Sequence, residues 1–434
     1  MDTEFKRRMS PSLALMTLAA LTPRDHKVTL ADENIKPVHT DDSPDLVGIT
    51  VNVDTSLRAY QIAAQYRARK IPVVLGGIHV SANPQEAQPH ADALCIGEAD
   101  ELWPSICQDT LNHCLKPVYQ GTQAANPVSI PIPKWEVIDS SQYLYTNIIC
   151  SSRGCPFRCE FCYNSCDYVH SGVRNRPVSE ILREIEKLGT RHVMFIDDNF
   201  IGNLDWTREF MRAIQSMNLT WNAAVSSNII HHPDVMDQMQ QTGCRSLFIG
   251  FESINSRSIT SVQKHQNHIQ NYETLIRELH QRDIMINASL VFGFDYDYPD
   301  VFKNTLNWLV SNKIETVTAH ILTPYPGTAL YKKFTHEDRI VDHDPTHYNT
   351  AHVVYEPKNM SREELYRGYL WVYNQFYSLK NIYRRLPDSR SQRMPYLMFN
   401  LMYRKFGRLT SRIMSGSLMQ KAGRLGRRLS YGID

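Results

Sequence analysis

The chain has 434 residues, more than one hydrophobic core usually serves, so we expect two domains and an appended segment. Its composition, 42% hydrophobic and 21% charged, is that of a globular protein, and the net charge of +2 gives no argument for nucleic acid binding. The apolar runs are shorter than the roughly eighteen residues that a membrane-spanning helix needs. The basic and apolar N-terminal stretch is bracketed by Pro11 and Pro23, which favours a helix over a signal peptide.

Residues 45–110 alternate between short apolar runs and helical patterns. Strands are expected at 45–51, 71–77 and 93–97, and helices at 55–70 and 101–111. Strands separated by helices of this length favour a parallel sheet with right-handed crossovers, so we expect a Rossmann-like domain over residues 1–115. Residues 116–143 contain several prolines and few periodic apolar residues, which predicts a linker.

From about residue 144 the alternation restarts and runs longer. Strands are expected at 145–151, 192–197, 221–227, 246–251, 285–292 and 315–322, and helices near 177–188, 205–217, 232–241, 267–282 and 300–311. Six successive strand–helix units predict a partial (β/α)6 barrel of the TIM type over residues 144–335, with its chemistry at the carboxyl ends of the strands. Residues 336–434 are expected to form a helical and basic extension, whose first helix opens with the capping box Ser361–Glu364.

Five of the nine cysteines fall within residues 150–166, and this crowding indicates a metal site. Cys155, Cys159 and Cys162 form a CxxxCxxC motif, whose soft thiolates and tight spacing suit an iron–sulfur cubane held by one loop. Three thiolates leave one iron without a protein sulfur, as a catalytic cluster requires. The alternative is a zinc site, with a fourth ligand from Cys150, Cys166 or His170.

With this motif, residues 145–335 resemble the radical S-adenosylmethionine (SAM) superfamily. The resemblance implies that the open iron of a [4Fe–4S] cluster binds the amino and carboxylate groups of SAM. Electron transfer then cleaves SAM to a 5′-deoxyadenosyl radical, which abstracts a substrate hydrogen. The resemblance also implies SAM contacts at the aromatic residue before the last cysteine and at four strand ends: Phe161, Asp198, Ser226, Glu252 and Gly293.

These SAM contacts have structural alternatives. Asp197 and Asp198 are also suited to cap the next helix. Glu252 has the charge to pair with a neighbouring arginine, and Gly293 stands where the backbone at a strand end often requires glycine.

The N-terminal residues resemble the cobalamin-binding domain that precedes many radical SAM cores. The resemblance rests on the stretches 45–50, 74–80 and 95–103, and it implies cobalamin contacts at Gly76, Gly77, Gly97 and Glu98. Glycines after parallel strands allow the backbone to approach a flat macrocycle or its nucleotide tail.

Two features depart from the pattern of cobalamin-binding domains. The motif DxHxxG, which supplies a histidine to cobalt in some of them, is replaced around Asn34 and Pro37, so we expect no lower-axial histidine. Residues 1–10 also do not read as the first strand of such a domain. His79 is a second candidate to face the cofactor, and the alternative is an exposed loop histidine.

The sequence therefore predicts a radical SAM enzyme, and methyl transfer to an unactivated carbon is the leading hypothesis. Methylcobalamin would deliver the methyl group, and SAM would serve as both oxidant and methyl source. The alternatives are a radical cyclase, rearrangement or oxidative enzyme without methyl transfer, and a zinc-stabilised binding protein. We expect a cytoplasmic protein with a small-molecule or lipid-like substrate, an external electron donor such as flavodoxin or ferredoxin, and no nucleic acid partner.

The C-terminal segment 394–434 interleaves apolar and basic residues. Two interpretations remain open for it. It is either a helix lying on an anionic membrane as a peripheral contact, or a helix packed on the barrel with a solvated charged face.

Overall fold

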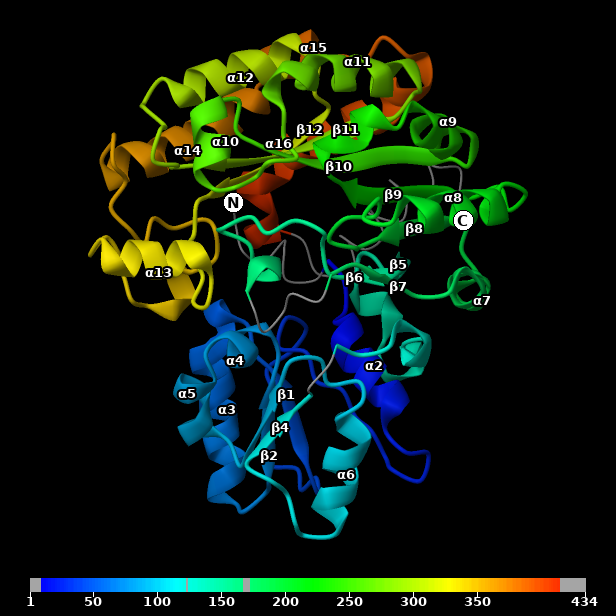
Figure 1. The fold of residues 1–434 in the computed structure, drawn as a ribbon, viewed down its shortest axis with the longest axis vertical. Helices are drawn as coiled ribbons and strands as arrows, with labels where there is room; N and C mark the ends of the chain where they lie inside the picture. The colour runs from blue at the N-terminus through cyan, green and yellow to red at the C-terminus, as the bar shows by residue number, and fades with distance from the viewer. Residues whose placement is uncertain (1–8, 122–123, 167–171, 414–434) are drawn as a thin grey trace.

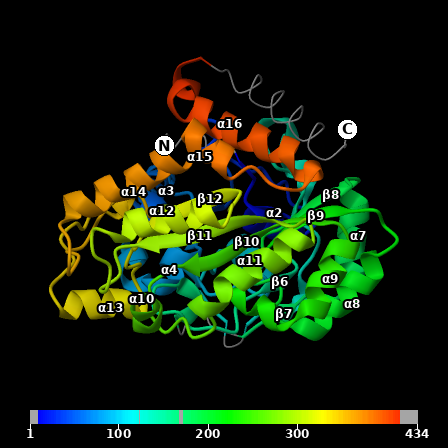
Figure 2. The same ribbon diagram turned by 90° about the horizontal axis from the view of Figure 1, so that it is seen from above.

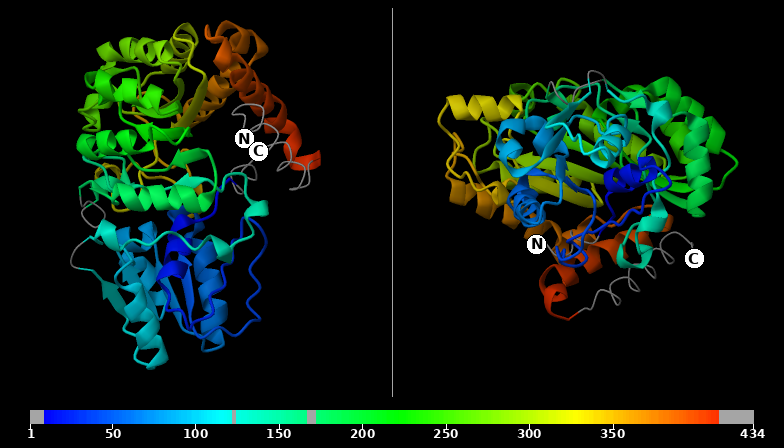
Figure 3. Two further views of the ribbon diagram at one scale, coloured as in Figure 1. Left: turned by 90° about the vertical axis from the view of Figure 1, so that its right-hand side faces the viewer. Right: turned by 90° about the horizontal axis from the view of Figure 1, so that it is seen from below.

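The computed structural model describes residues 9–121, 124–166 and 172–413. It contains an N-terminal α/β unit, a larger α/β unit and a set of C-terminal helices packed on the larger unit (Figure 1). The two units are stacked along the long axis of the molecule, and the C-terminal helices lie against one side of the larger unit (Figure 3).

Within the described residues, the N-terminal unit is built on four parallel strands, in the order β1 (Val47–Thr50), β2 (Val73–Gly76), β3 (Ala93–Ile96) and β4 (Val118–Gln120). Neighbouring residues of a strand point to opposite faces of the sheet. Val73 of β2 accordingly packs with helix α3 (Ser56–Ala68), and Val74 packs on the other face with α6 (Trp103–Leu111). The short helices α4 (Ile78–Ala82) and α5 (Pro84–Ala87) connect β2 to β3, and α2 (Leu13–Leu21) lies beside α6.

This parallel sheet confirms the predicted Rossmann-like class and corrects one expectation. Strand β4 lies inside residues 116–143, which were predicted to be a linker, and it pairs with β3. We therefore propose that the first domain ends after Gln120 rather than at residue 115. Strands β1 and β2 pair directly, so no further strand lies between them. The expectation that residues 1–10 form no strand falls mostly outside the described residues.

The described part of the larger unit contains a sheet of six parallel strands that follow one another in chain order. They are β5 (Ile148–Ile149), β8 (His192–Phe195), β9 (Thr220–Val225), β10 (Cys244–Glu252), β11 (Met285–Phe292) and β12 (Thr316–Ile321). The helices around them are α7 (Val178–Leu188), α8 (Leu204–Ile214), α9 (Pro233–Gln241), α10 (Ser256–Ser261), α11 (Tyr272–Gln281), α12 (Val301–Ser311) and α13 (Ala329–His336). This arrangement confirms the predicted partial barrel, because each strand of the sheet pairs in parallel with the next strand of the same sheet along the chain.

The C-terminal extension is helical, as predicted. Helix α14 (Arg362–Phe376) begins with the expected capping box and joins the core of the barrel. After α15 (Leu379–Arg384), α16 (Arg390–Ile413) crosses the same side of the barrel (Figure 2). Tyr396 of α16 donates a hydrogen bond to Ile382 O (2.6 Å), and Asn400 donates one to Glu315 O (3.1 Å). Among the described helices, none has the length and apolar character needed to cross a membrane.

Candidate functional site

The three cysteines of the CxxxCxxC motif lie on one loop after β5, between the short antiparallel strands β6 (Ser152–Arg153) and β7 (Arg174–Asn175). Cys159 is buried, and Cys155 and Cys162 are half-buried. Burial, with a smaller contribution from the nearby Cys159, Asp198 and Cys155 side chains, raises the pKa of the Cys162 thiol to about 12. The loop thus brings the three thiols within electrostatic reach of one another.

The donor set of this loop fits an iron–sulfur cubane. A cubane binds each cysteine through a different iron, whereas a structural zinc site gathers four donors around one ion. Of the candidate fourth zinc ligands, Cys150 directs its thiol to Ser152 O (3.1 Å), and His170 lies outside the described residues.

Asp197 anchors the segment that leads into the cysteine loop. Its buried carboxylate accepts hydrogen bonds from the hydroxyl of Ser151 (3.0 Å) and from the hydroxyl (2.7 Å) and backbone N–H of Ser152. Burial raises the pKa of Asp197 to about 6, although these donors oppose the shift. Asp197 therefore fixes the position of residues 151 and 152 next to the edge strand.

Asp198 is exposed and lies near the cysteines, since its negative charge contributes to the raised pKa of both Cys155 and Cys162. The alternative that Asp197 or Asp198 caps the next helix is wrong. Helix α8 is capped by Asn203, whose side chain accepts a hydrogen bond from Trp206 N. A SAM contact of Asp198 stays a prediction.

Glu252 ends β10 with a positive φ of 62° and is buried. Its carboxylate lies 2.6 Å from Nζ of Lys264 and accepts a hydrogen bond from Ser289 Oγ (3.3 Å). The ion-pair alternative is therefore realised, with a lysine in place of an arginine. Nζ of Lys264 also lies 5.8 Å from the centroid of the Phe161 ring. Two of the predicted SAM contacts, Phe161 and Glu252, thus meet around this lysine.

Ser226 and Gly293 occupy the ends of two further strands. Ser226 is buried, and its backbone N–H donates to Asn199 Oδ1 (3.2 Å) while Asn199 Nδ2 donates to Ser226 Oγ (3.1 Å). Gly293 has φ +101°, and a Cβ there would lie 2.2 Å from the hydroxyl of Tyr355. The close packing of Tyr355 and Leu365 thus explains why position 293 is a glycine. A contact between Gly293 and the adenine of SAM stays a prediction.

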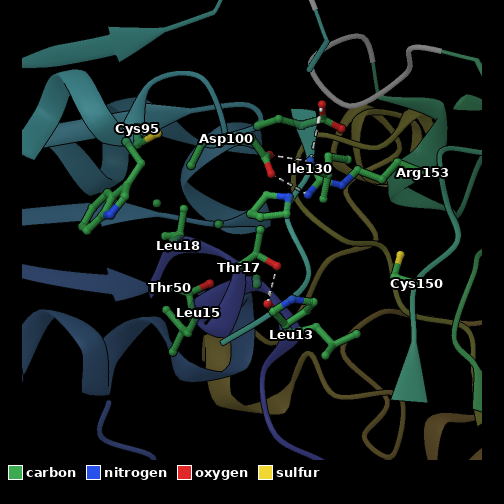
Figure 4. Close-up of a pocket in the computed structure, with 18 of the residues that line it drawn as sticks. Leu13, Leu15, Thr17, Leu18, Thr50, Cys95, Asp100, Ile130, Cys150 and Arg153 are labelled. Atoms are coloured by element: carbon green, nitrogen blue, oxygen red, sulfur yellow. Dashed lines mark hydrogen bonds and ion pairs between the residues drawn. The ribbon is translucent and has the colours of Figure 1, made fainter. Parts of the chain in front are cut away.

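A cavity of about 350 Å³ lies between the two units, at the carboxyl edge of the N-terminal sheet (Figure 4). The four predicted cobalamin contacts, Gly76, Gly77, Gly97 and Glu98, all line it. Cys150 and Arg153 line it from the larger unit, and α2 contributes apolar side chains such as Leu18. The volume is at the lower end of that found for small-molecule and cofactor sites.

The glycines of this cavity differ in what they permit. Gly77 has φ +101°, and a Cβ there would lie 2.8 Å from the backbone N and O of Val51. Gly97 has φ +84°, and nothing described lies within 4 Å of its ideal Cβ position. The absence of a side chain at Gly97 therefore leaves free space at the cavity wall, which would allow a flat cofactor to approach the backbone closely.

Glu98 joins the two units across the cavity. Its carboxylate lies 2.5 Å from Arg174 Nη2 and 3.6 Å from Arg153 Nη1, and Arg153 in turn lies 2.5 Å from Asp100. These partners could not be predicted from the sequence, because the arginines are more than fifty residues away. A cobalamin contact of Glu98 stays a prediction, and its ion pairs hold the carboxyl edge of the N-terminal sheet against the larger unit.

His79 is neither exposed nor on a loop, so that expectation is wrong. It lies on α4, is buried, and has Nε2 2.6 Å from Glu86 Oε2. It is not among the residues that line the cavity. A role for His79 toward cobalamin therefore has no support in this geometry.

Three family descriptions match the chain. "Radical SAM superfamily" matches residues 149–309, "B12 binding domain" matches residues 10–106, and "Domain of unknown function (DUF4070)" matches residues 328–410. The first two matches coincide with the units that carry the cysteine loop and the glycine-lined edge.

Relatives of known name include enzymes of two reaction types. A bacteriochlorophyllide d C-12(1)-methyltransferase of Chlorobaculum tepidum is 29% identical, over 87% of this chain and 85% of its own length. A hopanoid C-2 methylase of Rhodopseudomonas palustris is 26% identical, over 77% of this chain and 66% of its own length. An anaerobic magnesium-protoporphyrin IX monomethyl ester cyclase of Cereibacter sphaeroides is 23% identical, over 78% of this chain and 61% of its own length.

Among solved structures, the chain is similar to the cobalamin-dependent S-adenosylmethionine radical enzyme OxsB with aqua-cobalamin and S-adenosylmethionine bound. The TM-score is 0.68 at 13% identity, and the match covers 100% of this chain and 75% of that chain. At this identity the likeness concerns the fold alone, and it agrees with the two stacked α/β units described above.

Proposed function

The chain belongs to the radical SAM superfamily and carries a B12-binding domain, and from this premise we propose that it transfers a methyl group from SAM to an unactivated carbon. The observation that carries the proposal is the cavity between the two units. It places the glycine-lined edge of the N-terminal sheet opposite the segment that leads into the cysteine loop. Two relatives, the bacteriochlorophyllide methyltransferase and the hopanoid methylase, support it.

In this proposal Cys155, Cys159 and Cys162 hold a [4Fe–4S] cluster, and Gly76, Gly77 and Gly97 lie against cobalamin. When bound, the cluster with SAM supplies the one-electron chemistry that opens a C–H bond, and cobalamin supplies the methyl group. The predicted SAM contacts are Phe161, Asp198, Ser226, Glu252 and Gly293.

The side chains around these sites position the two units. Asp197 holds residues 151 and 152, from which the cysteine loop departs. The pairs of Glu98 with Arg174 and of Asp100 with Arg153 keep the sheet edge facing the barrel. Apolar residues of α2 line the cavity beside this edge.

The proposed reaction balances with two electrons. A substrate R–H, two SAM molecules and two electrons give R–CH₃, 5′-deoxyadenosine, methionine and S-adenosylhomocysteine. The substrate hydrogen ends on 5′-deoxyadenosine, and the methyl group of the second SAM ends on carbon. An external donor such as flavodoxin or ferredoxin would deliver the electrons.

Counting the two SAM-derived products tests the reaction type. With a substrate that is turned over, we expect S-adenosylhomocysteine and 5′-deoxyadenosine in equal amounts, measured by chromatography under anaerobic conditions. A bacteriochlorophyllide and a hopanoid are the substrates to test first, because relatives act on them. Formation of 5′-deoxyadenosine without S-adenosylhomocysteine would contradict methyl transfer and favour the cyclase reaction of the more distant relative.

A peripheral membrane contact through α16 is part of the proposal. Met394, Phe399 and Leu401 are 60%, 45% and 41% exposed. The buried face of α16, with Tyr396 and Asn400, packs on the barrel, so these apolar side chains point elsewhere. Residues 414–434 of the predicted contact lie outside the described residues.

Replacing Met394, Phe399 and Leu401 together by serine is expected to reduce flotation with anionic liposomes several-fold. Apolar burial and attraction of the basic segment to anionic lipid both contribute to such binding. The control is Leu57→Ser, an exposed apolar residue of the N-terminal unit. Equal flotation of the triple variant, the control and the unchanged protein would refute the contact.

A further inference from the structure

The segment between α10 and α11, residues 262–267, runs along the cysteine loop. The backbone N–H of Glu160 donates to Val262 O (3.1 Å), and Gln263 Nε2 donates to Glu160 Oε1 (2.7 Å). Further along, Gln266 Nε2 donates to the sulfur of Cys159 at 3.5 Å. Three contacts therefore tie this segment to the loop that carries the motif.

Two residues of the segment, one on each side of Gln266, are held by partners near the end of β10. Lys264 forms its 2.6 Å ion pair with Glu252 at the end of β10. Asn267 Nδ2 donates to Gly250 O (2.7 Å) and Phe251 O (3.0 Å) on the same strand. Gln266 lies between these two fixed points, so its amide is presented to Cys159 by a segment with little freedom to move.

The cysteine that receives this hydrogen bond is the most buried residue of the three. Cys159 is 7% exposed, and Gln266 is half-buried. A hydrogen bond in such a setting is electrostatically stronger than one in water. The contact also joins residues 107 positions apart, so it depends on the fold and on no local motif.

We propose that Gln266 is a positioning residue that raises the reduction potential of the cluster by donating a hydrogen bond to the Cys159 thiolate. Reduction adds negative charge to the cluster and its sulfur ligands. A donor at one sulfur stabilises that charge, and hydrogen bonds to sulfur are among the factors that set iron–sulfur potentials. The Lys264–Glu252 pair and Asn267 hold the donor in place. The inference rests on the proposed cluster at the three cysteines.

The test is a redox titration of the reconstituted full-length protein, followed by electron paramagnetic resonance without SAM or substrate. For Gln266→Leu we expect the ratio of reduced to oxidised cluster at a fixed potential to fall about tenfold, which is about 59 mV for a one-electron couple. Gln266→Glu should shift the ratio further in the same direction, because a carboxylate cannot donate and adds negative charge.

Gln263→Leu is the matched control. It removes a glutamine of the same segment that bonds the same loop but not a sulfur. We expect an unchanged potential for this variant and equal iron content in all variants. An equal shift in Gln263→Leu and Gln266→Leu, or no shift in Gln266→Leu, would overturn the proposal. If the unchanged protein itself binds no cluster, the cluster assignment fails instead, so the two failures are distinguishable.

Discussion

Replacement of Cys155 by alanine is expected to abolish iron binding and SAM cleavage. After anaerobic reconstitution with iron and sulfide, the unchanged protein should hold about four irons per chain, as a cubane does. Two remaining thiolates cannot retain the cluster, since only two of its four irons would then have a protein ligand. The loss of 5′-deoxyadenosine formation should exceed the roughly 10- to 100-fold that removing an outer-shell partner of a metal site costs.

Cys244→Ala is the control for this prediction. Cys244 is buried on β10 of the same unit and belongs to its hydrophobic core, so its loss removes a thiol without touching the loop. We expect full iron content in this variant and unchanged cobalamin binding in both. A colourless unchanged protein that binds about one zinc and ignores SAM would contradict the cluster and support the zinc alternative.

The sequence predicted the central strands of the barrel well because the pattern there is strong. Strand β11 was expected at 285–292 and is found at Met285–Phe292, and it is followed by α12, whose Val301, Phe302, Leu306 and Leu309 are buried. The edges were harder. Strand β4 has only three residues, with a proline just before it and alternating exposure, and nothing local separates such a strand from a linker.

The candidate site divides in the same way. The CxxxCxxC spacing is a local signal, so the sequence was sufficient to place the three cysteines on one loop. The partners of Glu252 and Cys159 were missed, because Lys264 and Gln266 belong to no motif and reach the site only through the fold. Glu98 was expected only as a cobalamin contact, because its ion-pair partners Arg153 and Arg174 come from another unit. Contacts across such distances leave no trace in a single sequence.

Replacement of Gly97 by leucine is expected to remove cobalamin binding while the barrel keeps its iron. Gly97 follows β3 on the wall of the cavity, and no described atom lies within 4 Å of its ideal Cβ position. The apo protein can therefore accept the side chain, which would occupy space that a bound macrocycle needs. We expect the affinity for hydroxocobalamin, measured by absorbance titration, to fall at least tenfold, or about 1.4 kcal/mol.

The backbone strain of this substitution can be separated from its effect in the cavity. A side chain at positive φ costs about 1–3 kcal/mol wherever it occurs. Gly189 has φ +61°, ends α7 at the surface, and likewise has nothing described within 4 Å of its ideal Cβ position, so Gly189→Leu carries the strain without entering the cavity. Both variants should lose similar thermal stability, and only Gly97→Leu should lose cobalamin. If both bind cobalamin like the unchanged protein, the cofactor does not lie against Gly97, and the cavity between the units has another occupant.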